Sequence, residues 1–180
     1  NAQFPGIGPF WGAPNSLCLK GLPHKGSLRH GHGMQEWRQS DLASKTAQSA
    51  WKLYTTGSVG SQAILGISHL YKLKRWLGGW GAVFPLETGS HFPKCPVVIG
   101  EIYPSFYGVD YMVPLQEKYP NQLYHILDAR QVRQVCDRFA CLMQTKMHIA
   151  HLFDIKFVKE SVLREEGWIM GVWQLEQQND

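Results

Sequence analysis

The chain has 180 residues, of which 44% are hydrophobic and 18% charged, enough for one domain with a buried core and short for two. Lys and Arg number 18 against 14 Asp and Glu, so the net charge of +4 permits a polyanionic partner without requiring one. Apolar runs such as Val97–Ile99 fall far short of the roughly 18 to 20 residues of a membrane helix. Wholesale disorder and a membrane span are thereby excluded, and we expect a soluble, cytoplasmic protein without a membrane partner.

The cysteines and the first residues give two further expectations. Cys18, Cys95, Cys136 and Cys141 form no C-x-x-C pair and no signal peptide is present, so we expect free thiols rather than disulfides or a structural zinc site. The chain opens at Asn1 without an initiator Met, which indicates a fragment or a processed chain.

The first third of the chain has little regular periodicity. Glycine and proline are frequent over residues 1–33, where neither a strand nor a helix repeat persists. We predict an irregular arm over residues 1–48, with one short polar helix over Gln35–Lys45, followed by an α/β domain over residues 49–180.

The middle of the chain alternates strand and helix patterns. Ser49–Tyr54 is typical of a short strand. Apolar residues then recur at helical spacing, from a start capped by Ser58 to a stop at Gly78–Gly79. Ala82–Glu87 predicts a strand that Pro85 confines to an edge or to its last residues. The apolar run Val97–Tyr103 predicts a central strand covered on both faces.

The last third is mainly helical. Residues 104–127 are typical of a loop, and Asp128 begins the clearest helix. Shorter helices are expected from Ile149 and over Ser161–Glu166. The apolar stripe of the helix that begins at Asp128 comprises Val132, Val135, Cys136, Phe139, Ala140 and Met143. The alternation favours an α/β fold with a mixed, mostly parallel sheet flanked by helices.

A glycine- and serine-rich turn precedes the first long helix. Gly57, Ser58, Gly60 and Ser61 would offer backbone N–H groups and hydroxyls at a helix N-terminus, an arrangement that attracts phosphate. The turn lacks the Gly-Lys-Ser/Thr ending of a P-loop. Tight-turn glycines and capping serines therefore stay an alternative to phosphate binding.

Three carboxylates are candidates for metal chemistry. Glu101 falls in an apolar strand, where a charge needs a metal, an ion pair or hydrogen bonds. Asp128 is expected to face the sheet or to cap its helix, whereas Asp137 is expected in solvent. Glu87 would be a third ligand if its strand is a neighbour. Such oxygen ligands suit Mg²⁺ or Mn²⁺.

Other side chains carry weaker signals. The eight histidines form no metal-binding pattern, and no nucleophile elbow is present. Aromatic residues make up 12% of the chain, but they look scattered rather than interleaved with basic residues as in a single-strand binder.

Several segments together resemble a known group of proteins. They are Gly8–Gly12, Thr56–Ile67, Val83–Thr88, Glu101–Ser105, Asp128–Val132 and Arg164–Val172. In this order, over nearly the whole chain, they look like the C-terminal part of a family of uncharacterised bacterial proteins labelled as cobalamin or molybdopterin-guanine dinucleotide biosynthesis proteins. They are also similar to predicted RNase H-like nucleases.

The resemblance implies an RNase H-like fold with metal-bound catalytic acids. Glu101 and Asp128 would be the catalytic carboxylates and Glu87 an accessory metal ligand. No Asp-bearing strand precedes Gly8–Phe10, so we expect either that the leading strands of such a fold are absent from this sequence or that the protein lacks one of the metal ligands.

Three functions follow from these expectations. The first is a divalent-metal-dependent phosphodiesterase acting on nucleic acid or a nucleotide. The second is a non-catalytic phosphate- or nucleotide-binding module. The third is a structural domain whose exposed sheet edge is covered by a partner chain.

Overall fold

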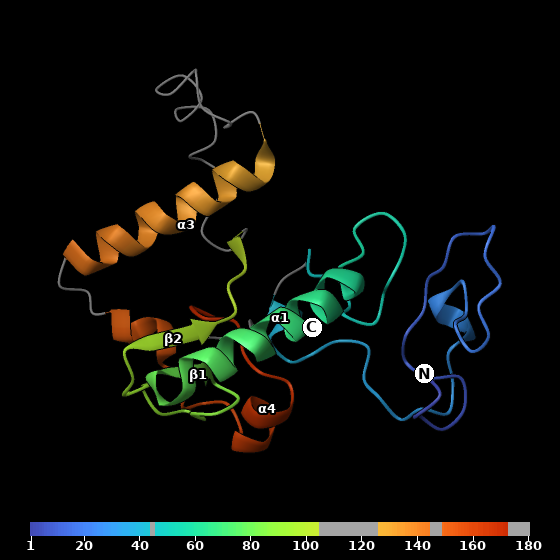
Figure 1. Cartoon of the computed structure of the whole chain (residues 1–180), viewed down its shortest axis with the longest axis horizontal. Coiled ribbons are helices and arrows are strands. Elements are labelled where there is room, and N and C mark those ends of the chain that lie inside the picture. Colours follow the sequence, from blue (N-terminus) through green and yellow to red (C-terminus); the bar gives the residue numbers. More distant parts are fainter. Residues whose placement is uncertain (44–45, 105–125, 145–148, 173–180) are drawn as a thin grey trace, which may run out of the picture. The chain divides into compact units, whose positions relative to one another are not determined.

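The structure is a computed structural model that describes residues 1–43, 46–104, 126–144 and 149–172 (Figure 1). Among the described residues it divides into two compact units, unit 1 over residues 1–81 and unit 2 over residues 82–172. The boundary differs from the one expected at residues 48 and 49. The reason is that the irregular arm pairs with the segment after it: Trp11 N donates to Trp51 O at 3.0 Å, and Leu53 N donates to Trp11 O at 2.8 Å.

Unit 1 begins as an irregular but well-bonded chain. An antiparallel bridge joins Ile7 to His30, and a parallel bridge joins Trp11 to Lys52. The expected strand over Ser49–Tyr54 is thus reduced to one bridging residue. The ring of Trp51 packs in T-shaped geometry with the rings of Phe4 and Phe10, whose centroids lie 6.4 and 4.9 Å from its own. These aromatic contacts replace regular strands as the centre of the arm.

The helix expected over Gln35–Lys45 is wrong over its described part. Only a 3-10 turn, Asp41–Ala43, forms there, and a second such turn covers Gly26–Leu28. Tertiary bonds take the backbone acceptors that a helix would need: Ser49 Oγ donates to Glu36 O, and Trp51 Nε1 donates to Gln35 O. Tertiary contacts across the arm therefore outweigh the local helix propensity of this segment.

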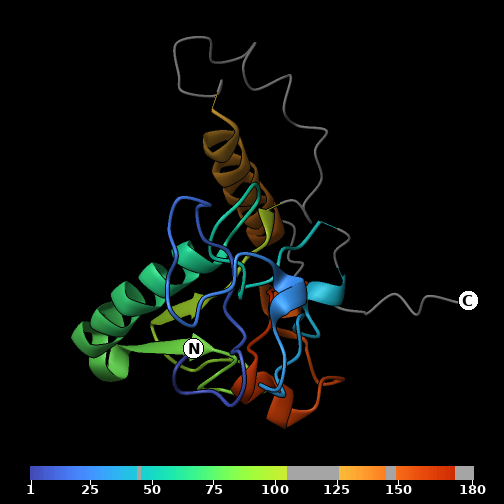
Figure 2. The same cartoon turned by 90° about the vertical axis from the view of Figure 1, so that its right-hand side faces the viewer.

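Helix α1, Gly60–Leu77, is the long helix of unit 1, and Figure 2 shows it unbroken. Its end at Gly78 confirms the expected glycine stop, since that residue has a φ of 54°. The predicted start capped by Ser58 is wrong, because the residue before the helix is Val59 and no side chain caps the helix. A 3-10 turn, Gly78–Trp80, follows. The helix was thus predicted correctly and its cap was not.

Unit 2 contains a small parallel sheet of two strands, β1 (Gly81–Phe84) and β2 (Val97–Gly100), which lie side by side in Figure 1. A parallel bridge from Glu101 to Ile169 extends the pairing on the far side of β2. Strand β1 ends before Pro85, as the proline predicted. Strand β2 is not covered on both faces: its residues are exposed or half-buried. That part of the prediction is wrong.

The helices of unit 2 are α3 (Leu127–Gln144) and α4 (Glu160–Glu165), with a 3-10 turn at Ile149–Phe153 where an α-helix was expected. The start of α3 agrees with the prediction at Asp128. Its buried residues are Gln134, Val135 and Leu142, so the predicted stripe is displaced, and Val132 is exposed. The loop expected over residues 104–127 falls almost entirely outside the described residues.

The core of unit 2 lies mainly between Leu152 and Val172. Phe84 meets Phe153 edge to face with centroids 4.8 Å apart, and Phe92 meets the same ring at 5.1 Å. Trp168 is almost fully buried, and its Nε1 donates to Val172 O at 2.9 Å. Gly100 lies against Met170, where a Cβ would collide with the sulfur. The segment after α4 therefore packs closely on the strands.

Candidate functional site

The turn predicted to bind phosphate is hydrogen-bonded to the segment that precedes α1. Gly60 N donates to Lys52 O at 2.9 Å, Ser58 N donates to Thr55 O at 3.0 Å, and Ser61 Oγ donates to Leu53 O. A Cβ at Gly60 would collide with the carbonyl oxygens of Ala50 and Lys52. Three of the four predicted phosphate-binding residues, Ser58, Gly60 and Ser61, thus hold the helix start by their own bonds.

Gly57, the fourth, has a φ of 73°, a backbone conformation that favours glycine. Beside it, Lys52 Nζ donates to Thr56 O at 2.7 Å and to Gln48 Oε1 at 3.1 Å. The nearest lysine is therefore bonded to the turn itself. The alternative of tight-turn glycines agrees with Gly57 and Gly60, whereas the expected capping by serines is wrong, because no side chain caps α1.

The three predicted carboxylates occupy separate local settings. Glu87 lies in the turn after β1, where its Oε2 accepts from Val83 N at 2.8 Å and its own N–H donates to Val83 O at 2.9 Å. Glu101 is exposed, and its backbone oxygen accepts from Met170 N at 2.9 Å. Asp128 is exposed in the first turn of α3. The burial argument for a metal at Glu101 is wrong, because this side chain reaches solvent.

No group of three or more His, Cys, Asp or Glu side chains within the described ranges could hold a metal ion. Glu87, Glu101 and Asp128 are all described, so they do not form the ligand set expected for Mg²⁺ or Mn²⁺. Asp137 forms an ion pair with Arg133 at 2.8 Å on the open side of α3. No hydrolytic step is derived from these acids.

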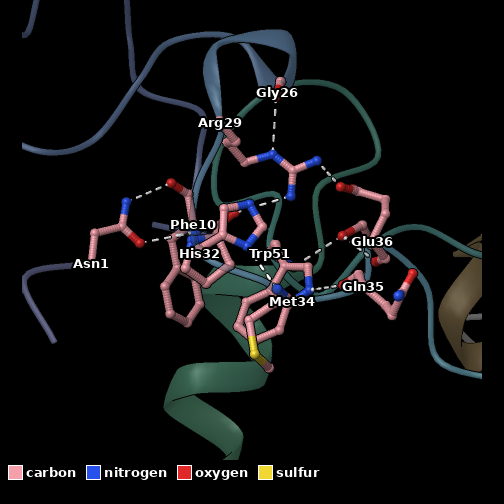
Figure 3. Close-up of polar contacts among 11 residues, drawn as sticks. Asn1, Phe10, Gly26, Arg29, His32, Met34, Gln35, Glu36 and Trp51 are labelled. Atoms are coloured by element: carbon pink, nitrogen blue, oxygen red, sulfur yellow. Dashed lines mark hydrogen bonds and ion pairs between the residues drawn. The ribbon is translucent and has the colours of Figure 1, made fainter. Parts of the chain in front are cut away.

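An arginine in unit 1 is the most enclosed cation among the described ion pairs. Arg29 Nε donates to Gly26 O at 3.1 Å, its Nη1 donates to Pro9 O at 3.2 Å, and its Nη2 is paired with Glu36 (Figure 3). Only 13% of the Arg29 side chain is exposed. Burial lowers the pKa of the Arg29 guanidinium, which nevertheless stays charged under ordinary conditions.

The network around Arg29 ties distant parts of the arm together. Asn1 Nδ2 donates to Phe10 O at 2.7 Å, and Phe10 N donates back to Asn1 Oδ1 at 2.9 Å (Figure 3). The Arg29 guanidinium also lies 5.9 Å from the centre of the Trp11 ring. These bonds satisfy Arg29 within the fold, so its role is structural.

The charges of the chain are divided unequally between its two parts. Residues 1–81 carry nine Lys and Arg against two acids, a net charge of +7, whereas residues 82–180 carry nine against twelve, a net charge of −3. Both acids of the first part are paired internally: Glu36 with Arg29, and Asp41 with Arg38 through a contact of 2.8 Å. Residues 1–81 therefore carry an excess of positive charge that their own two acids do not neutralise.

Much of this excess lies on α1, beside exposed apolar residues. The helix contains Lys72, Lys74 and Arg75 and has no acid. Tyr71, Trp76 and Trp80 are exposed around these cations, and the Arg75 guanidinium lies 5.8 Å from the centre of the Tyr71 ring. The aromatic residues that looked scattered are thus interleaved with basic ones here. The run Tyr-Lys-Leu-Lys-Arg-Trp in the sequence carries this signal.

Cysteines and histidines add no second site. All four cysteines are free thiols, as predicted. Cys18, Cys136 and Cys141 are exposed, and Cys95 is half-buried and donates from its sulfur to Val97 O at 3.1 Å. His148, one of the eight histidines, lies outside the described residues.

The segments that carry the family resemblance lie before the Gly26–Leu28 turn, across the start of α1, across the end of β1, directly after β2, in the first turns of α3 and from the end of α4 onward. No helix within the described residues is long and apolar enough to cross a membrane. Comparison of the chain with protein-family models, with curated proteins and with solved structures gives no match.

Proposed function

We propose that residues 1–81 act as a non-catalytic module that binds a phosphate-bearing polyanion. The division of charge is the observation that carries the proposal: the first part of the chain has a net charge of +7 and the second has −3. A concentration of positive charge in one part of a chain attracts polyanions and speeds their association.

The internal ion pairs strengthen this argument. Glu36 and Asp41 are the acids of residues 1–81, and each is already paired with an arginine. Lys20, Lys25, Lys72 and Arg75 have exposed side chains. Exposed cations of this kind gain affinity by releasing the counterions of a polyanion.

A binding role also accords better with the described carboxylates than hydrolysis does. Glu87 bonds the backbone of its own turn, and no three-ligand group is present among the residues described. A polyanion-binding module needs neither a metal nor a general base. The predicted phosphodiesterase therefore stays a prediction.

The test is a salt titration of binding to a single-stranded oligonucleotide in EDTA, with the full chain. We expect saturable binding, and the logarithm of the binding constant should fall linearly with the logarithm of the salt concentration. The double variant Lys72→Gln/Arg75→Gln should weaken binding and reduce the slope by about 1.4, at roughly 0.7 per phosphate contact.

The matched control is Lys94→Gln/Lys156→Gln, which removes the same charge from exposed lysines of unit 2. It should leave the affinity and the salt slope nearly unchanged. Equal losses in both double variants would show that only net charge matters. Absence of binding to the oligonucleotide and to every other phosphate polyanion at low salt would overturn the proposal.

A further inference from the structure

The surface of α1 is unusually apolar for a helix that faces solvent. Every residue of this helix is described, and only Gly60 among them is buried. Leu65 is 63% exposed, Ile67 66% and Trp76 81%. Contiguous apolar patches on protein surfaces mark interaction sites, because solvated apolar area costs free energy.

The exposed residues have a definite arrangement around the helix. Ile64, Ile67 and Tyr71 are spaced three and four residues apart, so they form one continuous stripe. Ala63, Leu70, Lys74 and Leu77 are half-buried and share another stripe, at the same helical spacing. The helix therefore has one half-buried side and an apolar stripe that stays open on another.

We infer that α1 lies on an anionic phospholipid surface, with its apolar residues inserted between the headgroups and its cations at the level of the phosphates. The inference rests on the proposed polyanion binding and names the polyanion. Interfacial helices of this kind combine apolar residues with Lys and Arg and have few acids. The α1 sequence has three cations and no acid.

The distribution of side chains along α1 fits an interface. Tyr71, Trp76 and the following Trp80 have rings with an apolar body and a polar edge, a type enriched at the level of lipid headgroups. Lys72 and Arg75 lie in the same turns and are exposed. Long basic side chains extend toward phosphates while their stems stay on apolar surface.

A lipid surface accounts for more of α1 than a nucleic acid does. Tyr71 and Trp76 could stack on bases, but the exposed aliphatic residues Ile64, Leu65 and Ile67 would gain little from a phosphate backbone. A lipid interface uses both kinds of side chain. A second copy of the chain is disfavoured as the occupant, because two acid-free helices with three cations each would repel across their contact.

The expectation of no membrane partner concerned spanning segments. A helix lying in the plane of the headgroups needs no 20-residue apolar run, and α1, at about 27 Å, is long enough to lie there. Its three cations are compatible with this position.

The test measures co-sedimentation of the full chain with phosphatidylcholine vesicles that contain or lack phosphatidylserine. We expect binding to the phosphatidylserine vesicles, weakened by salt, and little binding to phosphatidylcholine alone. The variant Ile64→Gln/Ile67→Gln removes two apolar side chains of the open stripe, which are 47% and 66% exposed, and it should reduce vesicle binding about tenfold or more while oligonucleotide binding stays unchanged.

The matched control is Leu28→Gln/Leu42→Gln, because these leucines are 52% and 62% exposed in unit 1 outside α1. It should bind vesicles like the unchanged protein. Binding to the oligonucleotide without binding to vesicles would overturn the lipid inference and leave the proposed function standing. Binding to neither would overturn both. A dimer in light scattering that Ile64→Gln/Ile67→Gln abolishes, without vesicle binding, would assign the stripe to a second copy.

Discussion

The substitution Trp168→Phe tests whether the segment after α4 forms the core of unit 2. Trp168 is 1% exposed, and its Nε1 is the donor to Val172 O at 2.9 Å. Phenylalanine fills less space, which forfeits roughly two methylene equivalents at about 0.8 kcal/mol each. The Val172 oxygen loses its donor in a buried position, at a cost of about 1 to 3 kcal/mol. Together these losses predict a destabilisation of about 3 kcal/mol or more.

The assay is urea denaturation of the full chain followed by far-UV circular dichroism, which does not depend on the fluorescence of the substituted residue. Trp76→Phe is the matched control, because Trp76 is 81% exposed on α1, and this variant should change stability by less than about 0.5 kcal/mol. If the two Trp→Phe variants shift the transition equally, Trp168 is not the buried anchor that the contacts indicate.

Two further substitution pairs have matched expectations in the same assay. Gly60→Ala should destabilise unit 1 by about 1 to 3 kcal/mol, because the added Cβ collides with two carbonyl oxygens. Gly66→Ala, which has open space around it, should stabilise α1 by about 0.5 to 1 kcal/mol. Stability changes of the same sign in both variants would refute the packing at the helix start. Glu36→Gln should lower the stability by about 1 to 3 kcal/mol, because it leaves the enclosed Arg29 without its carboxylate. Asp137→Asn should lower the stability by less than about 0.5 kcal/mol, because its ion pair with Arg133 is more exposed. Equal losses of stability would refute the difference in burial.

The elements that sequence reasoning located correctly have local signals. Helix α1 ends where Gly78 supplies a positive φ, and β1 ends where Pro85 removes a donor. Helix α3 begins within one residue of the predicted Asp128. In each case one or two neighbouring residues decide the boundary, so the amino-acid sequence alone contains the information.

Burial could not be predicted in the same way. The run Val97–Ile99 has the composition of a strand covered on both faces, yet β2 is partly exposed because the sheet has one neighbouring strand and a single bridge at Glu101. A carboxylate that the run seemed to bury therefore reaches solvent. What covers a strand depends on distant segments, such as Ile169, that composition does not pair with it.

The candidate site was missed for a different reason. Charge was averaged over the chain, which gave +4 and concealed +7 in residues 1–81. The signal on α1 was present as three basic residues between Tyr71 and Trp76. Its meaning depends on exposure, because the same residues inside a bundle would be ordinary core. The structure supplies that exposure, and the sequence supplies the absence of acids.

The stability of α1 explains how its open stripe can serve binding without weakening the fold. An isolated 18-residue helix is only marginally stable in water, because forming the first turn is the costly step. Here the bonds from Gly60 N to Lys52 O and from Ser61 Oγ to Leu53 O hold that first turn in place. Lys74 and Arg75 in the last turn stabilise the helix by interacting favourably with its dipole. Because these bonds hold the helix start and one side of the helix is half-buried, substitutions at Ile64 and Ile67 should alter surface binding while leaving unit 1 folded.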